Sequence, residues 1–313
     1  MIKIKNQTLN LVMYHYIKKS VDNHYLNLKV LNVRKFEKQI IYFKKKFNVL
    51  DNDGFCEILQ SKKIPKKPSF LLTFDDGYKD HFKYVLPELI KRKLSGAFFV
   101  PRVAVQENKM LDVNSIHHIL SCSNDINYLV KELNLQCILS GITNNQIQSY
   151  LNKFCVGNRF DDAKTVYFKL MLQRVLPEEV RHIIISNLFK KFVGISEAEF
   201  SNELYMSLNE VQQLVGNGMH VGSHGSMHYW LDRISIQRQK EDILTSLEFL
   251  EEIGMSRTNW IMCYPYGAYN NDTLSLVKKL GASVGVTTEV READLSIDNP
   301  FILPRFDTND FPK

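Results

Sequence analysis

Two adjacent aspartates, Asp75 and Asp76, follow a run of apolar residues and precede a glycine. If that run is a buried strand, the two carboxylates lie at its end, where each loses hydration and repels the other when ionised. A bound cation would remove this penalty, so the pair is a candidate for metal binding and acid–base catalysis. Taken alone, the Asp-Asp-Gly sequence fits equally well a turn in which one aspartate caps the next helix.

Two histidines, His224 and His228, stand four residues apart after a second strand-like run. At this spacing a helical turn or a tight loop directs both imidazoles toward one point, where they could share a metal ion. Such pairs also arise by chance, so the spacing alone does not establish a site. We expect the neighbouring His220 to be a packing or surface residue.

The two motifs together supply two nitrogens and one oxygen, a ligand set that is typical of zinc and similar divalent ions. A structural site would usually have a fourth protein ligand, whereas three ligands leave room for water and substrate. The carboxylate that is not a ligand could then remove a proton from the attacking water. The expected cofactor is one divalent ion, with zinc the first choice and other divalent transition metals also suitable.

A third segment, Cys263 to Gly267, reads Cys-Tyr-Pro-Tyr-Gly and follows another strand-like run. A Pro-Tyr-Gly turn at this place could offer a backbone N–H to a developing oxyanion and a tyrosine ring to the face of a sugar. By itself this turn is ordinary.

The elements that must position these residues alternate between short apolar runs and amphipathic stretches. Several runs are apolar on both faces, as expected of strands with helices on one side and a barrel interior on the other. The alternation predicts an α/β fold with a largely parallel sheet or barrel. Seven strands are predicted, at residues 9–14, 70–74, 96–100, 219–222, 260–264, 283–287 and 301–303.

Helix signals lie between these runs. Residues 33–47 place apolar side chains on one face and lysines on the other, which favours an outer barrel helix over a membrane-binding one. Ser207 and Glu210 form a capping-box pattern, and residues 270–272 offer caps for a helix that ends near Gly281.

About a hundred residues, 102–205, show helical periodicity but no convincing strand. This stretch is far longer than an ordinary connection. We expect a helical insertion within one domain that spans residues 1–313, because no repeat or long linker separates independent domains. The insertion could act as a lid over the barrel or as a peripheral dimerisation element.

The composition suits one large α/β domain, with 313 residues of which 44% are hydrophobic. The formal charge of +6 is dispersed, which argues against nucleic acid but would tolerate a phosphate-bearing substrate. Five cysteines without CxxC spacing indicate reduced thiols. Because neither a signal-peptide pattern nor an apolar run of roughly 20 residues is present, we expect a cytoplasmic protein without a transmembrane segment.

The motifs Thr-Phe-Asp-Asp-Gly, His-Gly-Ser-Met-His and Tyr-Pro-Tyr-Gly, in this order at predicted strand ends, resemble those of the polysaccharide deacetylase family. This family contains the NodB homology domain of carbohydrate esterase family four. The resemblance covers about residues 9–101 and 205–310 and leaves out the insertion. It implies a distorted (β/α) barrel of seven strands, which agrees with the seven predicted runs and with a site at the strand ends.

The resemblance also implies roles for single residues. Asp75 corresponds to the catalytic base, and the backbone N–H of Tyr266 corresponds to the oxyanion donor. Pro265 and Gly267 flank Tyr266 in the substrate-binding turn. The implied metal ligands are Asp76, His224 and His228.

The sequence departs from the family pattern at two places. Many members have an arginine at the position of Cys263 to orient the base, and many have a late histidine that protonates the leaving amine, but no histidine follows His228. The opening Leu-Val-Met-Tyr-His resembles the circularly permuted poly-N-acetylglucosamine deacetylases, which makes His15 the candidate acid. Near the C-terminus, Arg305 is the candidate replacement for the missing arginine.

These observations predict a metal-dependent N-deacetylase that converts an N-acetylated sugar to acetate and a free amino sugar. Without an export signal, we expect the substrate to be an intermediate of surface-glycan assembly on a nucleotide or lipid diphosphate. Two alternatives stay open: a metal-dependent amidase acting on a non-sugar amide, and a catalytically inactive carbohydrate-binding barrel. The intact set of aspartates and histidines counts against the inactive barrel, because a binding protein has no use for the unliganded Asp75.

Overall fold

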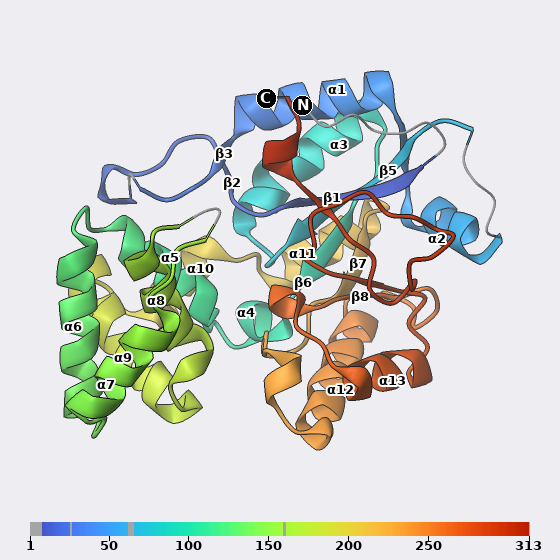
Figure 1. Ribbon diagram of the computed structural model, residues 1–313. Helices are drawn as coiled ribbons and strands as arrows, with labels where there is room; N and C mark the ends of the chain where they lie inside the picture. Colours follow the sequence, from blue (N-terminus) through green and yellow to red (C-terminus); the bar gives the residue numbers. More distant parts are fainter. Residues whose placement is uncertain (1–7, 26, 62–65, 159–160, 313) are drawn as a thin grey trace. The chain divides into compact units, whose positions relative to one another are not determined.

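The computed structural model describes residues 8–25, 27–61, 66–158 and 161–312, and the chain divides into two compact units. Figure 1 shows the parallel sheet of the first unit and the helices of both. The first unit consists of Met1–Ser20, Val30–Asn108 and Asn202–Lys313, and the second of Val21–Lys29 and Lys109–Ser201.

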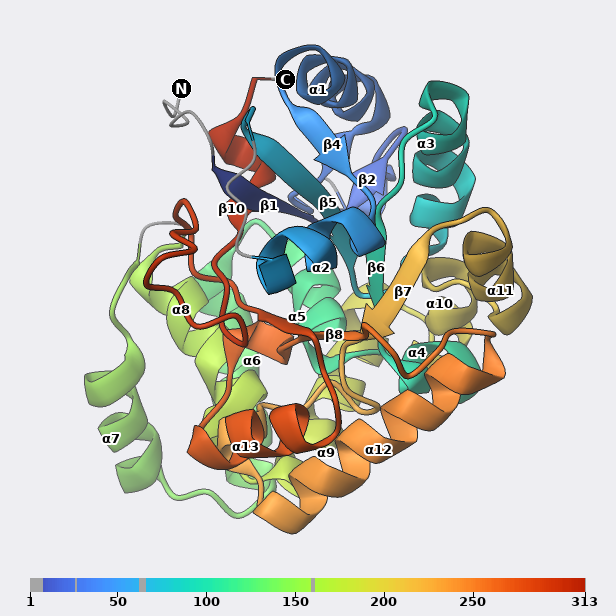
Figure 2. The same cartoon turned by 90° about the vertical axis from the view of Figure 1, so that its right-hand side faces the viewer.

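The main sheet of the first unit has eight strands among the described residues, and every pair in it is parallel. Along its hydrogen-bonded path the order is β10-β1-β5-β6-β7-β8-β9, and β4 pairs with the first half of β5 (Figure 2). Residues that follow neighbouring strands therefore lie at the same edge of the sheet. The strands are β1 Leu9–Tyr14, β4 Asn48–Leu50, β5 Ser69–Asp75, β6 Ala97–Val100, β7 His220–Ser223, β8 Ile261–Cys263, β9 Val284–Val286 and β10 Phe306–Asp307.

The segment before β10 joins the two edges of this sheet. The Leu303 N–H donates to the Gly285 carbonyl at 2.8 Å, and the Leu303 carbonyl accepts from the Thr287 N–H at 2.9 Å. A few residues later, Phe306 pairs with Val12 of β1. The sheet therefore curls into a (β/α) barrel form, and this segment occupies edges that would otherwise be open to pairing.

Six of the seven predicted strands agree with β1, β5, β6, β7, β8 and β9 to within one residue at each end. The seventh prediction, residues 301–303, is wrong for most of its length, because only Leu303 forms an isolated bridge, to Val286. Pro304 follows directly and has no N–H to donate, which delays the last strand to β10. The short strand β4 is not predicted from the sequence.

The two faces of the sheet bury different side chains, since successive residues of a strand point to opposite sides. Val12, Phe70 and Leu72 face outward into a core shared with the outer helices. Leu9, Leu71 and their counterparts from the other strands face the interior, together with Phe55 of α2 Asn52–Ser61. The outer helices are α1 Val33–Lys46, α3 Leu86–Arg92, α11 Leu208–Gly216, α12 Ile236–Glu252 and α13 Asn271–Lys279.

The helix caps lie where the sequence predicts them. Ser207 and Glu210 form the capping box of α11. Asn270 caps α13 through a reciprocal bond with Thr273, and this helix ends two residues before Gly281. Both caps satisfy backbone donors at helix N-termini.

The second unit is helical in all of its described residues that form regular structure. It includes residues 21–29, which leave the first unit between β2 Ile17–Lys18 and β3 Leu31–Asn32, whereas α4 Arg102–Gln106 belongs to the first unit. The stretch 102–205 thus contributes helices to both units, and its role as one insertion stays a prediction. The remaining helices are α5 Asp112–Ser121, α6 Ile126–Leu139, α7 Asn144–Phe154, α8 Ala163–Leu170, α9 Glu178–Val193 and α10 Glu197–Leu204.

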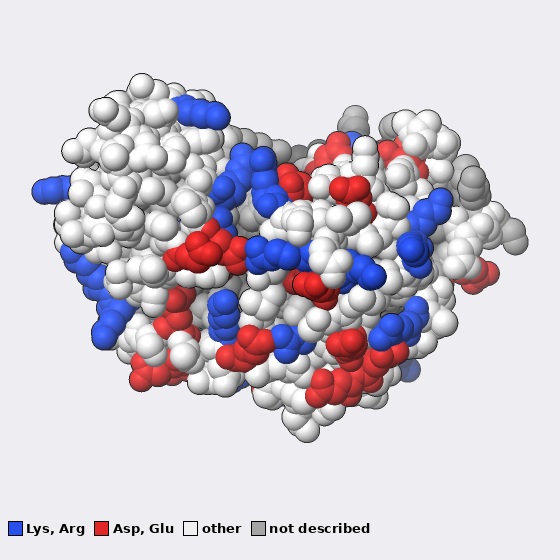
Figure 3. All heavy atoms as spheres, turned by 90° about the horizontal axis from the view of Figure 1, so that it is seen from below, with Lys and Arg blue, Asp and Glu red and all other residues white. Residues whose placement is uncertain are grey.

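In the described ranges, none of the helices combines the length and apolar composition that a membrane span needs. On the face shown in Figure 3, basic and acidic side chains are interspersed rather than gathered by sign. This face therefore offers no single-sign field of the kind that attracts a polyanion.

Candidate active site

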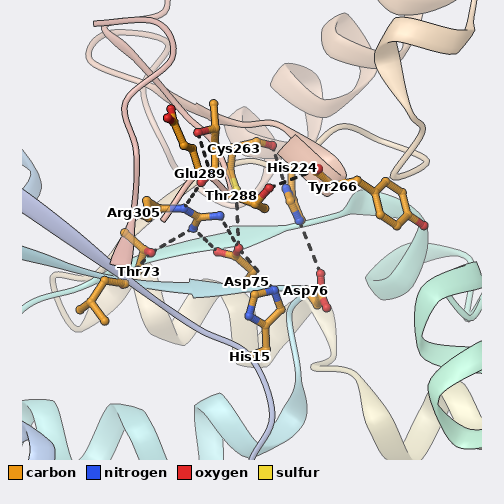
Figure 4. A network of polar contacts seen from close by, with 12 residues as sticks. His15, Thr73, Asp75, Asp76, His224, Cys263, Tyr266, Thr288, Glu289 and Arg305 are labelled. Carbon is orange, nitrogen blue, oxygen red and sulfur yellow. Dashed lines mark hydrogen bonds and ion pairs between the residues drawn. The ribbon is translucent and has the colours of Figure 1, made fainter. Parts of the chain in front are cut away.

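The residues singled out from the sequence gather where the strands of the first unit end (Figure 4). Each stands at or after the carboxyl end of a strand, except Arg305, which stands just before β10. The strand-end residues are His15 after β1, Asp75 and Asp76 at the end of β5, His224 and His228 after β7, and Cys263 and Tyr266 at and after β8.

Asp76, His224 and His228 bring one ligand atom each to a common point. The Asp76 Oδ1 atom lies 3.5 Å from His224 Nε2 and 3.6 Å from His228 Nε2. The three ligand atoms all lie within 4.8 Å of one another, and the three side chains are buried. Two imidazole nitrogens and a carboxylate oxygen are donors that zinc and related divalent ions prefer.

Hydrogen bonds orient Asp76 and His224 for metal binding. Each bond is made by the polar atom of the side chain that does not face the common point. The Tyr78 hydroxyl donates to Asp76 Oδ2 at 2.6 Å, which leaves Oδ1 for the common point. His224 Nδ1 lies 2.7 Å from the Cys263 carbonyl, which can only accept, so Nδ1 carries a proton and Nε2 is the ring nitrogen that faces the common point. A lone pair that faces a carboxylate oxygen at 3.5 Å is repulsive unless a cation or a proton lies between them. The residues therefore fit a divalent ion.

Burial and nearby charges set the protonation of the trio. Burial would raise the pKa of Asp76, but His224, His15 and His228 hold it well below its usual value, so the carboxylate is ionised. Burial and the neighbouring His224 lower the pKa of His228 to about 3, so this imidazole is neutral and can offer a lone pair. Burial would lower the pKa of His224, but Cys263 and the two aspartates raise it well above its usual value, so a bound metal ion would have to displace a proton from this ring.

Asp75, although adjacent to Asp76 in the chain, has a different partner. Arg305 donates from Nη1 to Asp75 Oδ1 at 2.8 Å and from Nη2 to Oδ2 at 2.7 Å. Both side chains are buried, with 0% of Arg305 and 1% of Asp75 exposed. Burial would raise the pKa of Asp75, but the guanidinium lowers it, so the carboxylate is ionised and can accept a proton.

Further bonds fix the guanidinium in place. Arg305 Nε donates to the Thr287 carbonyl at 2.8 Å, and Nη1 also donates to Thr73 Oγ1 at 3.0 Å. Cys263 is the position at which the resemblance implies an arginine, and its Sγ lies 3.7 Å from Asp75 Oδ2. Burial raises the pKa of this thiol, so it is neutral beside the carboxylate. The charge that neutralises Asp75 thus comes from the segment before β10 and not from β8.

His15 approaches Asp75 from a different side than Arg305 does (Figure 4). Its Nε2 lies 3.7 Å from Asp75 Oδ2, and its side chain is 43% exposed, far more than the 2% of Asp75. The buried His81 side chain contacts the His15 carbonyl through Nε2 at 2.8 Å, and burial lowers the pKa of His81 to about 4. A neutral imidazole can donate this bond, so His81 holds the backbone of His15.

The turn after β8 has an unusual backbone. Tyr266 and Gly267 both have positive φ angles, +58° and +70°. A side chain at Gly267 would bring its Cβ to 2.4 Å from Thr288 Oγ1, so glycine is required here. The Tyr266 ring packs against His228, with centroids 4.7 Å apart, and stacks on Trp230 at 4.3 Å.

Sequence patterns did not reveal three neighbours of the site. Tyr78 follows the Asp-Asp-Gly motif directly, and Trp230 follows the second histidine closely. Their positions beside the motifs could have indicated that they lie near the site. Asp242, which contacts the loop between the histidines, has no such signal because it lies far along α12.

Residues 62–153 and 188–285, more than half of the chain, match the family model described as polysaccharide deacetylase. The chain belongs to the polysaccharide deacetylase family. The family prediction is therefore confirmed, and β1, which lies at the N-terminus beside β10, agrees with the permuted branch. The α/β barrel prediction is confirmed as well.

The chain is similar to YxkH of Bacillus subtilis strain 168, which is itself named only as a candidate polysaccharide deacetylase. The two are 28% identical over 135 residues, which make up 43% of this chain and 45% of YxkH. The match therefore spans less than half of the length of that curated relative.

Solved structures of low identity share the fold over nearly the whole chain. The deacetylase PplD of Streptococcus pyogenes, in complex with acetate, has a TM-score of 0.60 at 16% identity and covers 97% of this chain and 93% of its own. IcaB of Ammonifex degensii has a TM-score of 0.57 at 16% identity with the same coverage. The BpsB deacetylase domain of Bordetella bronchiseptica has a TM-score of 0.55 at 13% identity and covers 97% and 98%.

The ion pair between Asp75 and Arg305 can be tested by unfolding. Arg305→Met should lower the free energy of unfolding by about 3–5 kcal/mol, because it leaves a buried carboxylate without its partner. Asp75→Asn in the same protein should restore part of this loss, since the unpaired charge is then gone. Urea unfolding of the two single variants and the double variant measures both effects.

Arg291→Met is the matched control, because Arg291 pairs with Asp298 while 40% of its side chain is exposed. Pairs of that kind contribute about 0–1 kcal/mol. An Arg305→Met variant that is no less stable than Arg291→Met would show that the buried pair does not hold the site together.

Proposed function

We propose that this chain is a metal-dependent N-deacetylase that hydrolyses the acetamide of an N-acetylated sugar. Family membership supports the deacetylase chemistry. The observation that carries the proposal is that two adjacent carboxylates have different partners: Asp76 faces two imidazoles, whereas both oxygens of Asp75 accept from Arg305. This arrangement provides a metal-binding set and a separate proton acceptor side by side.

Asp76, His224 and His228 would hold the ion, with zinc as the first candidate. When bound there, a divalent ion supplies Lewis-acid polarisation of the acetamide carbonyl and favours deprotonation of water. A second set of possible ligands, Asp75, His224 and Cys263, is also close in space. It suits a cation poorly, because both oxygens of Asp75 already accept from Arg305 and burial keeps the Cys263 thiol protonated.

The protein's own residues can move the protons that the reaction requires. Asp75 accepts a proton as the water oxygen bonds to the acetamide carbon, and the carbonyl electron pair moves onto its oxygen. In our proposal the Tyr266 N–H donates to this oxyanion. His15 then gives a proton to the amide nitrogen, so the C–N bond breaks and releases acetate and a free amine.

The turn of Pro265, Tyr266 and Gly267 would also shape the substrate site. The positive φ angles at Tyr266 and Gly267 set the direction of the turn beside His228. The Tyr266 ring, backed by Trp230, would offer an aromatic surface to a pyranose ring. We further propose that the sugar is a surface-glycan intermediate carried on a nucleotide or lipid diphosphate, which the dispersed net positive charge would tolerate.

Acetate release tests this function. The purified chain should release acetate from N-acetylhexosamine oligomers or from nucleotide-linked N-acetylhexosamine and much less from simple acetamides, because the aromatic turn favours a sugar. A chelator should abolish turnover, and added zinc should restore it. His224→Ala and His228→Ala should lose both bound metal and activity, whereas His182→Ala, in the second unit, should keep both. Full activity after chelation would exclude the metal, and activity on non-sugar amides alone would favour an amidase.

The acid role of His15 gives a second test. His15→Gln should lower kcat roughly a hundredfold, the usual range for loss of a general acid, because amine expulsion needs a proton on nitrogen. Metal content and KM should change little, since His15 does not belong to the ligand trio. His24→Gln, in the second unit, is the control for losing one partly exposed histidine. A His15→Gln enzyme with near wild-type kcat would assign the acid to another group.

A further inference from the structure

The loop between the two histidines rests on a buried carboxylate that no motif contains. Asp242, on α12, is only 5% exposed. Its Oδ1 accepts from the Met227 N–H at 2.8 Å, and its Oδ2 accepts from the Ser226 N–H at 3.1 Å. Two backbone donors in the middle of the loop therefore converge on one side chain, in a geometry that favours an ionised acceptor.

The loop is shaped to let this carboxylate approach. Gly225 has a φ angle of +68°, and a Cβ on it would lie 2.6 Å from Asp242 Oδ2. One turn further along α12, Ser246 shares a hydrogen bond of 2.8 Å with Ser223, whose hydroxyl also accepts from the Gly225 N–H. Asp242 and Ser246 thus hold the start and the middle of the loop from one helix face.

A second helix, α4, holds the same loop. Arg102 Nε donates to Ser226 Oγ at 2.9 Å, and the Val103 N–H donates to the Ser226 carbonyl at 3.0 Å. The backbone N–H, the carbonyl and the side chain of Ser226 are all engaged, so the loop has little freedom to move as long as Asp242 is present.

The orientation of His228, the ligand that ends this loop, depends on the loop more than the orientations of Asp76 and His224 do. Asp76 is oriented by Tyr78 and His224 by the Cys263 carbonyl. By contrast, no group in the part of the chain that the structure describes hydrogen-bonds to the buried His228 Nδ1. His228 also has a φ angle of +58°, a backbone conformation that a non-glycine residue keeps only when its surroundings impose it.

We propose that Asp242 is a positioning residue for the metal site: its carboxylate clamps the backbone between His224 and His228 and so sets the direction of His228. The proposal rests on the proposed metal-dependent function. For His228, this clamp takes the place of the ring hydrogen bond through which metal-ligating histidines are usually oriented. Both carboxylate oxygens matter, because the Ser226 and Met227 N–H groups bond to different oxygens, and an amide in the same place would turn its NH₂ group toward one of these donors.

The experiment compares zinc affinity in the full chain for the wild type, Asp242→Asn and Glu241→Gln. Glu241 is the matched control, because it is the adjacent residue of α12, its side chain is exposed, and the change removes the same charge. Competition with a chromophoric chelator should show zinc binding about 10–100-fold weaker in Asp242→Asn, as for loss of other groups that orient ligands. Glu241→Gln should bind zinc as the wild type does.

Two further readouts separate positioning from general destabilisation. With cobalt in place of zinc, Asp242→Asn should show a changed visible absorption spectrum, and its kcat should fall while KM for the sugar stays nearly constant. Gly225→Ala, which keeps the carboxylate but pushes the loop away from it, should also weaken zinc binding, and it decides the matter if Asp242→Asn does not fold. Wild-type protein that binds no zinc would overturn the proposed function. If the wild type binds zinc and Asp242→Asn has the same zinc affinity and cobalt spectrum, the positioning role alone is overturned. If Asp242→Asn does not fold, the same result in Gly225→Ala overturns it.

Discussion

Two carboxylates that are neighbours in the chain, Asp75 and Asp76, are both ionised and both buried at the end of β5. Like charges this close, without water, are costly unless each has its own source of positive charge. The chain separates them by a change of backbone direction: Asp75 ends the strand, and Asp76 takes a φ angle of +74°. The two side chains therefore reach different partners, and the rest of the site is arranged around that separation.

The partners come from distant parts of the sequence, so the whole sheet is needed to assemble them. Arg305 reaches Asp75 from the segment that joins β9 to β1, and His224 and His228 reach Asp76 from the loop after β7. Loss of sheet closure would therefore remove the counter-charge of the proposed base. The protonation state of Asp75 therefore depends on closure of the barrel. In a site built within one loop, the charge that pairs with the base would not depend on the rest of the sheet.

The sequence predicted what depends on local pattern. The strands were found because their residues are apolar on both faces, and the metal-binding candidates because they share short motifs at strand ends. The contact of Arg305 with Asp75 could be suggested only through the family resemblance, since no local pattern pairs residues so far apart. Asp242 could not be predicted, because a single aspartate on an amphipathic helix resembles any solvated residue until the fold brings it to a backbone loop. The last strand begins later than predicted because Pro304 has no N–H to donate. This proline is visible in the sequence, but the prediction followed the apolar run before it.

The central claim is that a divalent ion binds to Asp76 and the two histidines while Asp75 remains free to accept a proton. Anomalous X-ray scattering at the zinc edge, from crystals grown with zinc, tests this claim most directly. The account predicts one strong peak about 2.0–2.2 Å from Asp76 Oδ1, His224 Nε2 and His228 Nε2, with Arg305 still paired to Asp75. A peak between Asp75, His224 and Cys263, or no peak at the histidine pair in zinc-saturated protein, would contradict it.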